Sequence, residues 1–336
     1  LHGRETMTKI DRRDFINAGG ALVAGAGLGL LPRFSDEALA QGAGMEYVFL
    51  SCVTQVPFWV DHRKGLEDVA KVLNVKTSFT GPLDFDTAAQ ARQLDELVAR
   101  QPAGILIFPG DPSALAPGIN RAAEAGIPVA MIIGDAPGTK RLVHLGITNF
   151  DAGKVGGAML AEAIGGKGKV LLGTFPAPPV LERVEGYKAY FKEKAPEIEV
   201  VDVINDKADP SYAPTAYSQG LIAHPDVVGI GGTDGDSGKG AAIAVTEARR
   251  KGQVKIVAMD RNEDMLPYIE DGTILGAVVQ KSYLEAYLAV HLLHWVNTSA
   301  VKFVPNWKAT GVNPIPEHIA TGVMPVTKAN VSQFKH

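Results

Sequence analysis

Two adjacent aromatic residues, Phe58 and Trp59, stand where a predicted strand gives way to a predicted helix. The apolar run before them covers 47–52, and an amphipathic run begins near Asp61. Pro57 suits the first turn of such a helix, because its missing N–H needs no partner there. Flat aromatic rings at this position can cover the apolar C–H face of a sugar. The alternative is a hydrophobic plug that closes the start of the helix, and both interpretations fit the position.

No motif of covalent, metal or nucleotide chemistry accompanies these rings. A phosphate-binding loop over 233–240 would need Gly at 233 and Ser or Thr at 240, whereas the chain has Thr233 and Gly240. No G-x-G-x-x-G opens the first helix, and H-E-x-x-H and G-x-S-x-G motifs are absent from the sequence. His291 and His294 are spaced as a helical pair, for which the edge of a core is a better interpretation than a metal site. We therefore expect no catalytic residue, no cofactor and no metal.

Short apolar runs alternate with longer amphipathic runs from about Met45 onward. Most of the apolar runs are rich in β-branched residues and nearly unbroken, as strands buried on both faces should be. Between them, 85–100 and 154–163 place apolar residues on one helical face. This alternation predicts parallel sheets joined by right-handed crossovers. The predicted strands are 47–52, 75–79, 104–108, 128–133, 169–174, 199–204, 227–231, 255–259 and 274–279.

These strands fall into two sets, one ending near Asn149 and the other near Gln280. We expect an α/β protein of two doubly wound parallel-sheet lobes joined by a three-crossing hinge. Ligands of open α/β sheets bind at the carboxyl ends of the strands, so the cleft between the lobes is the expected site. The predicted N-terminal lobe is 45–149 plus 281–311, and the predicted C-terminal lobe is 150–280 plus 312–336.

The first 40 residues have the layout of an export signal. Arg12 and Arg13 precede the uncharged run 18–31, and Ala38-Leu39-Ala40 follows as a small-residue cleavage site. The paired arginines and the mildly apolar, Gly-rich core resemble a twin-arginine signal, which exports folded proteins. A buried helix or a membrane anchor is the alternative, but 18–31 is short of the ~20 apolar residues that span a bilayer. We expect a periplasmic protein.

Composition excludes several classes of partner. The net charge is −4 and no basic run is present, so nothing is offered to a nucleic acid or to an anionic membrane surface. No segment after Gln41 is apolar for long enough to cross a bilayer. Cys52 is the single cysteine, which rules out a disulfide within the chain.

The order of these elements and six short motifs resemble the type I periplasmic binding proteins, particularly the ribose-binding-protein group. The resemblance covers about Met45 to about Pro316, and it depends on the order and spacing of the motifs together. The motifs are Pro57-Phe58-Trp59, Ala125-Gly126-Ile127-Pro128-Val129, Leu181-Glu182-Arg183-Val184-Glu185-Gly186-Tyr187, Ala223-His224-Pro225-Asp226-Val227, Ala258-Met259-Asp260 and Val278-Val279-Gln280.

The resemblance implies the substrate-binding component of an ABC importer. Such a protein acts as a monomer, captures a sugar or sugar-like polyol between its lobes by hinge closure, and delivers it to a transporter permease. Two other functions stay open. A secreted carbohydrate-active enzyme would use carboxylates such as Asp135, Asp234 and Asp260. A sugar-sensing protein without a transport role, such as a repressor, would need a helix-turn-helix before Met45, where the leader stands.

The resemblance also implies a binding site. Phe58 and Trp59 would sandwich the sugar ring, and Arg183 would donate hydrogen bonds to sugar oxygens. Asp260 would accept from hydroxyls, and the amide of Gln280 would donate and accept. We expect Trp59 and Arg183 at the cleft, outside the core of either lobe. The alternatives are a surface ion pair for Arg183, a helix N-cap for Asp260 and a solvated strand end for Gln280.

Three positions depart from the family pattern. Thr233-Asp234 replaces Asn-Asp after the seventh strand, and both residues are expected to contact the ligand. Gly134-Asp135-Ala136 replaces Asp-Arg after the fourth strand, so Asp135 would supply the carboxylate without its arginine. Gln55-Val56 replaces the asparagine before the aromatics. The altered polar set argues against ribose itself as the ligand.

Overall fold

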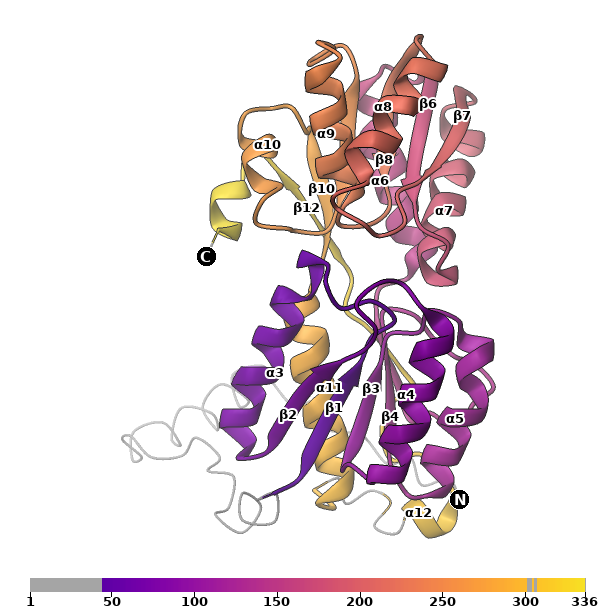
Figure 1. The fold of residues 1–336 in the computed structure, drawn as a ribbon, viewed down its shortest axis with the longest axis vertical. Coiled ribbons are helices and arrows are strands. Elements are labelled where there is room, and N and C mark those ends of the chain that lie inside the picture. The colour runs from indigo at the N-terminus through magenta and orange to yellow at the C-terminus, as the bar shows by residue number, and fades with distance from the viewer. Residues whose placement is uncertain (1–43, 301–303, 305–306, 336) are drawn as a thin grey trace, which may run out of the picture.

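The computed structural model describes residues 44–300, 304 and 307–335, which form two α/β lobes (Figure 1). The predicted export signal lies outside the described residues. Within them, no helix combines the length and the apolar character that a membrane span requires. Each lobe is built on a six-stranded sheet with helices on both faces, which confirms the predicted fold class.

The N-terminal lobe has a parallel sheet of order β11-β5-β4-β3-β1-β2. Its central strands are buried on both faces, which explains their nearly unbroken apolar sequences. The strands are β1 (Glu46–Leu50), β2 (Lys76–Thr80), β3 (Gly104–Ile107), β4 (Val129–Ile132), β5 (Val143–Gly146) and β11 (His318–Ala320).

Two layers of helices cover this sheet. One face packs against α3 (Val60–Leu73) and α11 (Ser282–Asn297), and the other packs against α4 (Thr87–Arg100) and α5 (Pro112–Glu124). Asp86 and Asp111 begin α4 and α5 by accepting backbone N–H groups of the first turn. A short helix α12 (Trp307–Thr310) lies at the end of the lobe remote from the other lobe (Figure 1).

The C-terminal lobe repeats this plan with the sheet order β12-β10-β9-β8-β6-β7. Its strands are parallel except for β12, which runs antiparallel to β10. The strands are β6 (Lys167–Thr174), β7 (Glu197–Asn205), β8 (Val227–Gly232), β9 (Lys255–Met259), β10 (Gly276–Gln280) and β12 (Val323–Thr327). The helices are α6 (Asn149–Ala163), α7 (Pro178–Lys194), α8 (Ala213–Ala223), α9 (Ser237–Glu247), α10 (Leu266–Glu270) and the 3₁₀ helix η2 (Val331–Phe334).

Glycines bring α6 and α7 into close contact, and this contact sets the backbone position of Arg183. A Cβ atom at position 153 would lie 2.0 Å from the carbonyl oxygen of Arg183. A Cβ atom at position 186 would lie 2.1 Å from the carbonyl oxygen of Phe150. Glycine therefore lets two backbones meet where side chains would hold them apart.

The chain crosses between the lobes after β5, after β10 and after β11. The predicted third crossing near Gly311 is therefore wrong, because 318–320 still pairs with β5 of the N-terminal sheet. The segment 312–320 accordingly belongs with the N-terminal lobe. The irregular tail gave no periodic signal for this strand of three residues. Strand β5, with four residues, was likewise not among the predicted strands.

Candidate functional site

A cavity of about 400 Å³, counting the open space at its mouth, lies between the two lobes. It is lined by residues of both lobes, which lie in the segments that follow the carboxyl ends of strands. Ligand sites of open α/β sheets lie at such ends. The position therefore suits a small organic ligand.

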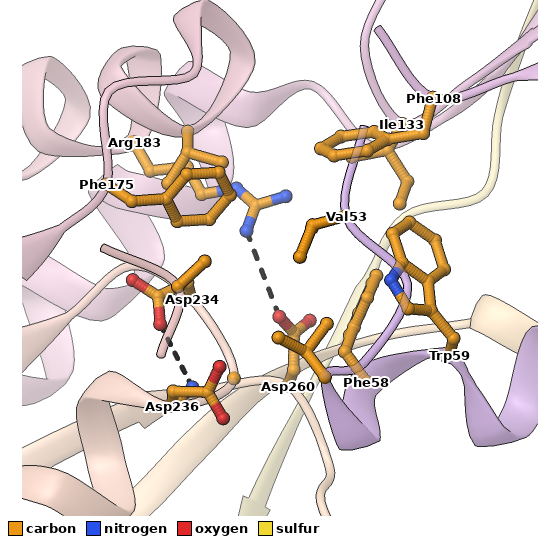
Figure 2. Close-up of a pocket in the computed structure, with 14 residues that line it drawn as sticks. Val53, Phe58, Trp59, Phe108, Ile133, Phe175, Arg183, Asp234, Asp236 and Asp260 are labelled. Atoms are coloured by element: carbon orange, nitrogen blue, oxygen red, sulfur yellow. Dashed lines mark hydrogen bonds and ion pairs between the residues drawn. The ribbon is translucent and has the colours of Figure 1, made fainter. Parts of the chain in front are cut away.

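The N-terminal lobe gives the cavity an apolar wall. In Figure 2, Phe58, Trp59, Phe108 and Ile133 lie on the side of this lobe, across from Arg183, Asp234 and Asp236. Phe58 and Trp59 form the 3₁₀ helix η1 (Pro57–Trp59), and Phe108 follows β3. All the residues that this lobe contributes to the lining are apolar, namely Val53, Val56, Phe58, Trp59, Phe108 and Ile133.

Phe58 and Trp59 are neighbours with different surroundings. Trp59 is 1% exposed, and its ring contacts Phe49, Phe79 and Phe108 at centroid distances of 5.3 to 5.5 Å. Its indole N–H has no hydrogen-bond partner within the described chain. The expectation that Trp59 lies outside a lobe core is therefore wrong, because it belongs to the core and also borders the cavity. Phe58 is only partly buried and lies on the cavity side of Trp59.

Ile133 reaches the cavity from a constrained backbone. It directly follows β4 and has φ 65°, a left-handed conformation that is uncommon for a β-branched residue. Its N–H donates to the carbonyl of Leu145, and its own carbonyl accepts from Asn149 Nδ2 at 3.1 Å. These bonds on both sides hold a conformation that the side chain alone would disfavour.

Arg183 is the centre of the polar wall, which the C-terminal lobe supplies. It is 3% exposed and lines the cavity, so it lies at the cleft between the lobes. Nε donates to Asn149 Oδ1 and Nη1 donates to the Thr233 carbonyl, each at 2.8 Å. Nη1 also lies 3.9 Å from Asp260 Oδ2. Burial lowers the pKa of Arg183, while the carboxylates of Asp260 and Asp234 oppose that shift.

Asp260 occupies the position after β9 that Ile133 occupies after β4. Its φ is 66°, and its N–H donates to the Val278 carbonyl of the neighbouring strand. Its Oδ1 accepts from Gln280 Nε2 at 2.6 Å. Burial raises the pKa of Asp260 to about 6, against the opposing effect of Arg183. Gln280 thus orients Asp260 and does not itself line the cavity.

The loop after β8 adds two more carboxylates to the cavity lining. Asp234 Oδ1 accepts the backbone N–H groups of Asp236 at 2.9 Å and of Ser237 at 3.0 Å. The Ser237 hydroxyl lies 2.7 Å from both Asp234 Oδ2 and Asp206 Oδ2. A hydroxyl has one proton to donate, so a second proton must come from one of these carboxyls. Burial, followed by the charge of Asp234, raises the pKa of Asp206 well above its ordinary value.

A comparison of the sequence with protein-family models identifies the family to which this fold belongs. The model described as "periplasmic binding protein domain" matches residues 47–296. The chain belongs to this family. The two-lobed α/β fold is that of the type I periplasmic binding proteins, as the resemblance implied.

Individual periplasmic binding proteins of known structure or ligand agree with this assignment. An arabinose-binding protein of Geobacillus stearothermophilus is 31% identical, covers 87% of this chain and 100% of its own, and superposes with a TM-score of 0.72. A solute-binding protein of Burkholderia graminis in complex with D-arabinose is 27% identical, with coverages of 88% and 99% and a TM-score of 0.79. The xylitol-binding protein of Mycolicibacterium smegmatis is 26% identical over 93% of both chains.

Five of the eight predicted ligand contacts meet in the cavity of this periplasmic binding protein: Phe58, Trp59, Arg183, Asp234 and Asp260. Thr233 contributes only its carbonyl, to Arg183, because its hydroxyl donates to the Gly173 carbonyl at 2.7 Å. Asp135 lines a separate cavity, where it forms a bidentate ion pair with Arg141. Its predicted contact with the same ligand is wrong, because Ile133 and not Asp135 directly follows β4.

Sequence reasoning missed nine of the lining residues, including the four with large or charged side chains Phe108, Ile133, Phe175 and Asp236. The first three each follow directly after a strand, and that position was the available signal. Asp236 lies in the Gly-rich loop after β8, two residues beyond the predicted contact Asp234. No set of three or more metal-ligating side chains is found among the described residues.

Proposed function

We propose that this protein is the substrate-binding component of an ABC importer and captures a sugar or a sugar-like polyol between its lobes. The observation that carries the proposal is one cavity with an aromatic, apolar wall facing a wall of guanidinium and carboxylates. Sugars have the same two-sided character, with C–H faces and hydroxyl edges. The arabinose, xylitol, ribose and allose ligands named for its relatives support the same class.

The walls have different tasks in capture. The ring of Phe58 covers the apolar face of the ligand, and Trp59 packs against Phe58 with ring centroids 4.8 Å apart. Arg183 donates to ligand oxygens, and Asp234 and Asp260 accept from hydroxyls. Because the two walls belong to different lobes, a ligand completes its contacts only when the lobes are closed. Its higher affinity for the closed form drives closure.

An ion pair links the lobes at the edge of the cleft. Arg261, which follows β9, donates through Nη2 to Asp61 Oδ1 at 2.7 Å and through Nε to Asp61 Oδ2 at 3.1 Å. Asp61 lies in the first turn of α3 in the N-terminal lobe. Phe85 and Phe175 also meet across the lobes, with ring centroids 5.4 Å apart. These contacts fit a closed arrangement, which a hinge near 147–149, 281 and 321–322 would open.

The proposal extends to location and assembly. The protein would be exported through its twin-arginine signal, act in the periplasm as a monomer and dock on a transporter permease. Replacing Arg12 and Arg13 by lysine should leave the protein in the cytoplasmic fraction. Unchanged export would overturn the twin-arginine route and would leave the binding proposal intact.

Titration calorimetry with a panel of pentoses, hexoses and polyols tests the central function. We expect saturable binding of one ligand per chain, without consumption of that ligand. A panel without any binding would contradict the proposal. Turnover of a bound sugar would favour the secreted carbohydrate-active enzyme instead.

A further inference from the structure

The polar wall of the cavity contains more negative than positive groups. Asp234, Asp236 and Asp260 line it, and Arg183 is the one basic side chain among the lining residues. Every one of these side chains is at least nine-tenths buried. Asp206 lies directly behind the wall and is bridged to Asp234 through Ser237. Ionising all of these carboxyls at such burial is costly unless a second positive charge joins Arg183.

Among these carboxylates, Asp236 is the one available to bind a ligand. It is 6% exposed, and within the described chain no hydrogen bond or ion pair reaches its carboxylate. Its neighbour Asp234, by contrast, accepts two backbone N–H groups and meets the Ser237 hydroxyl. In Figure 2 the Asp236 carboxylate points toward the side of the cavity where Asp260 lies. A buried acceptor without a donor, at the wall of a cavity, calls for a donor from the ligand.

We infer that the ligand carries a positively charged amino group, which binds at Asp236 and Asp260. This inference rests on the proposed function and narrows its ligand class to amino sugars and amino polyols. The neutral remainder of the ligand then lies against Phe58 and the rest of the apolar wall.

An ammonium group suits the carboxylates of Asp236 and Asp260 better than a hydroxyl group does. A hydroxyl donates one hydrogen bond and brings no charge, whereas an ammonium group donates three and offsets one carboxylate. Arg183 already donates two of its hydrogen bonds within the protein, to Asn149 and to the Thr233 carbonyl. The aromatic rings add to the preference, because their faces attract cations.

The protonation state of Asp236 provides a second measurable quantity besides affinity, namely the number of protons released on binding. Burial, followed by the charges of Asp234, Asp264 and Asp260, raises the pKa of Asp236 to about 8, and Lys239 opposes this. The ligand-free carboxyl therefore holds its proton at pH 7. A bound cation favours the ionised carboxylate and lowers that pKa, so binding releases a proton. A neutral polyol offers no such charge.

The test compares matched probes by titration calorimetry at pH 7, in buffers of different ionisation enthalpy. The pairs are 1-amino-1-deoxy-D-glucitol with D-glucitol, and D-galactosamine with D-galactose. We expect at least one amino probe to bind about a hundredfold more tightly than its neutral partner, with release of about one proton. Asp236→Asn should abolish the proton release and weaken that probe by roughly thirtyfold or more.

Asp226→Asn is the matched control, because Asp226 pairs with Lys169 at the surface, does not line the cavity and is not among the charges that shift the pKa of Asp236. It should bind like the unaltered protein. Tighter binding of a neutral probe, or equal proton release in Asp236→Asn, would overturn the inference while leaving the proposed function in place. Failure of these probes and of every neutral sugar in the panel would count against both.

Discussion

Ile133 and Asp260 occupy equivalent positions in the two lobes and carry opposite chemistry. Each directly follows its strand, β4 or β9, and each has a left-handed backbone with φ near 65°. Each donates its N–H to a carbonyl of the adjacent strand. Yet Ile133 gives the cavity an apolar surface, whereas Asp260 gives it a carboxylate paired with Gln280 and facing Arg183.

The difference shows how one fold can divide recognition between its halves. Apolar contact is not directional, so the N-terminal wall can accept a ligand face in several orientations. Hydrogen bonds to buried polar groups are directional, and leaving one unmade costs about 1–3 kcal/mol. Selectivity should therefore come mainly from the C-terminal wall.

Removing Arg183 should break the polar wall and produce the largest effect. Arg183→Ala leaves the buried Asp260 charge without its partner, so the free energy of unfolding should fall by about 3–5 kcal/mol and ligand binding should vanish. Denaturant unfolding and calorimetry measure the two effects. Lys188→Ala, on the exposed face of the same helix, should cost less than about 0.5 kcal/mol. A fully stable Arg183→Ala variant would contradict the network.

Substitutions of the two adjacent aromatic residues should separate an effect on stability from an effect on ligand binding. Trp59→Ala removes a ring packed among Phe49, Phe79 and Phe108, which should cost about 3–5 kcal/mol of unfolding free energy. Phe58→Ala should cost far less stability but should weaken the ligand by about 0.5–1.5 kcal/mol beyond the loss of buried area. Thermal melts without ligand and calorimetry distinguish them. Equal destabilisation by both variants would show that Phe58 also supports the core.

The acidic wall should make the ligand-free protein less stable as pH rises. An unfolded Asp has a pKa near 3.9, whereas burial raises the pKa of folded Asp260 to about 6, so the native state binds more protons between these values. The free energy of unfolding should therefore fall across this window, by roughly 3 kcal/mol for Asp260. Asp236 extends the fall to about pH 8. Denaturant melts at several pH values should show a flatter profile for Asp260→Asn, and an unchanged slope would count against the raised pKa.

A polar group placed on the apolar wall should weaken ligand binding with little effect on stability. Ile133→Asn suits the left-handed backbone, so the gain in conformation should offset part of the lost burial and stability should change by about 1 kcal/mol at most. Ligand affinity should fall, because a polar group then faces the apolar side of the ligand. Ile133→Val keeps the apolar surface and should bind normally. Tighter binding by Ile133→Asn would show that the N-terminal wall meets hydroxyls.

Breaking the ion pair between the lobes should give the smallest effect. Asp61→Asn removes a charge from the pair with Arg261, which should weaken closure by about 0.5–1 kcal/mol and affinity a few-fold. Asp68→Asn alters a pair on the same helix that lies within one lobe, so it should leave affinity unchanged. Identical affinities for both variants would mean that the pair with Arg261 does not contribute to closure.

Patterns along the chain predicted the fold class and most of the candidate site. Buried parallel strands give nearly unbroken apolar runs, so their carboxyl ends, and with them Phe58 and Asp260, could be placed. Asp135 could not be separated from Ile133, because the end of β4 was uncertain by one or two residues and only three-dimensional register decides which side chain enters the cavity. The dual position of Trp59 and the unpartnered state of Asp236 depend on contacts between distant segments, which no local pattern encodes.

A crystal structure with the tightest ligand of the calorimetric panel would show which wall contacts which face of the ligand. We expect one ligand molecule between the lobes, with its C–H face against Phe58. Its donors should lie within hydrogen-bond distance of Asp236 or Asp260, and an oxygen should accept from Arg183. A ligand in the separate cavity at Asp135 and His144, or one whose hydroxyls point at the N-terminal wall, would contradict this expectation.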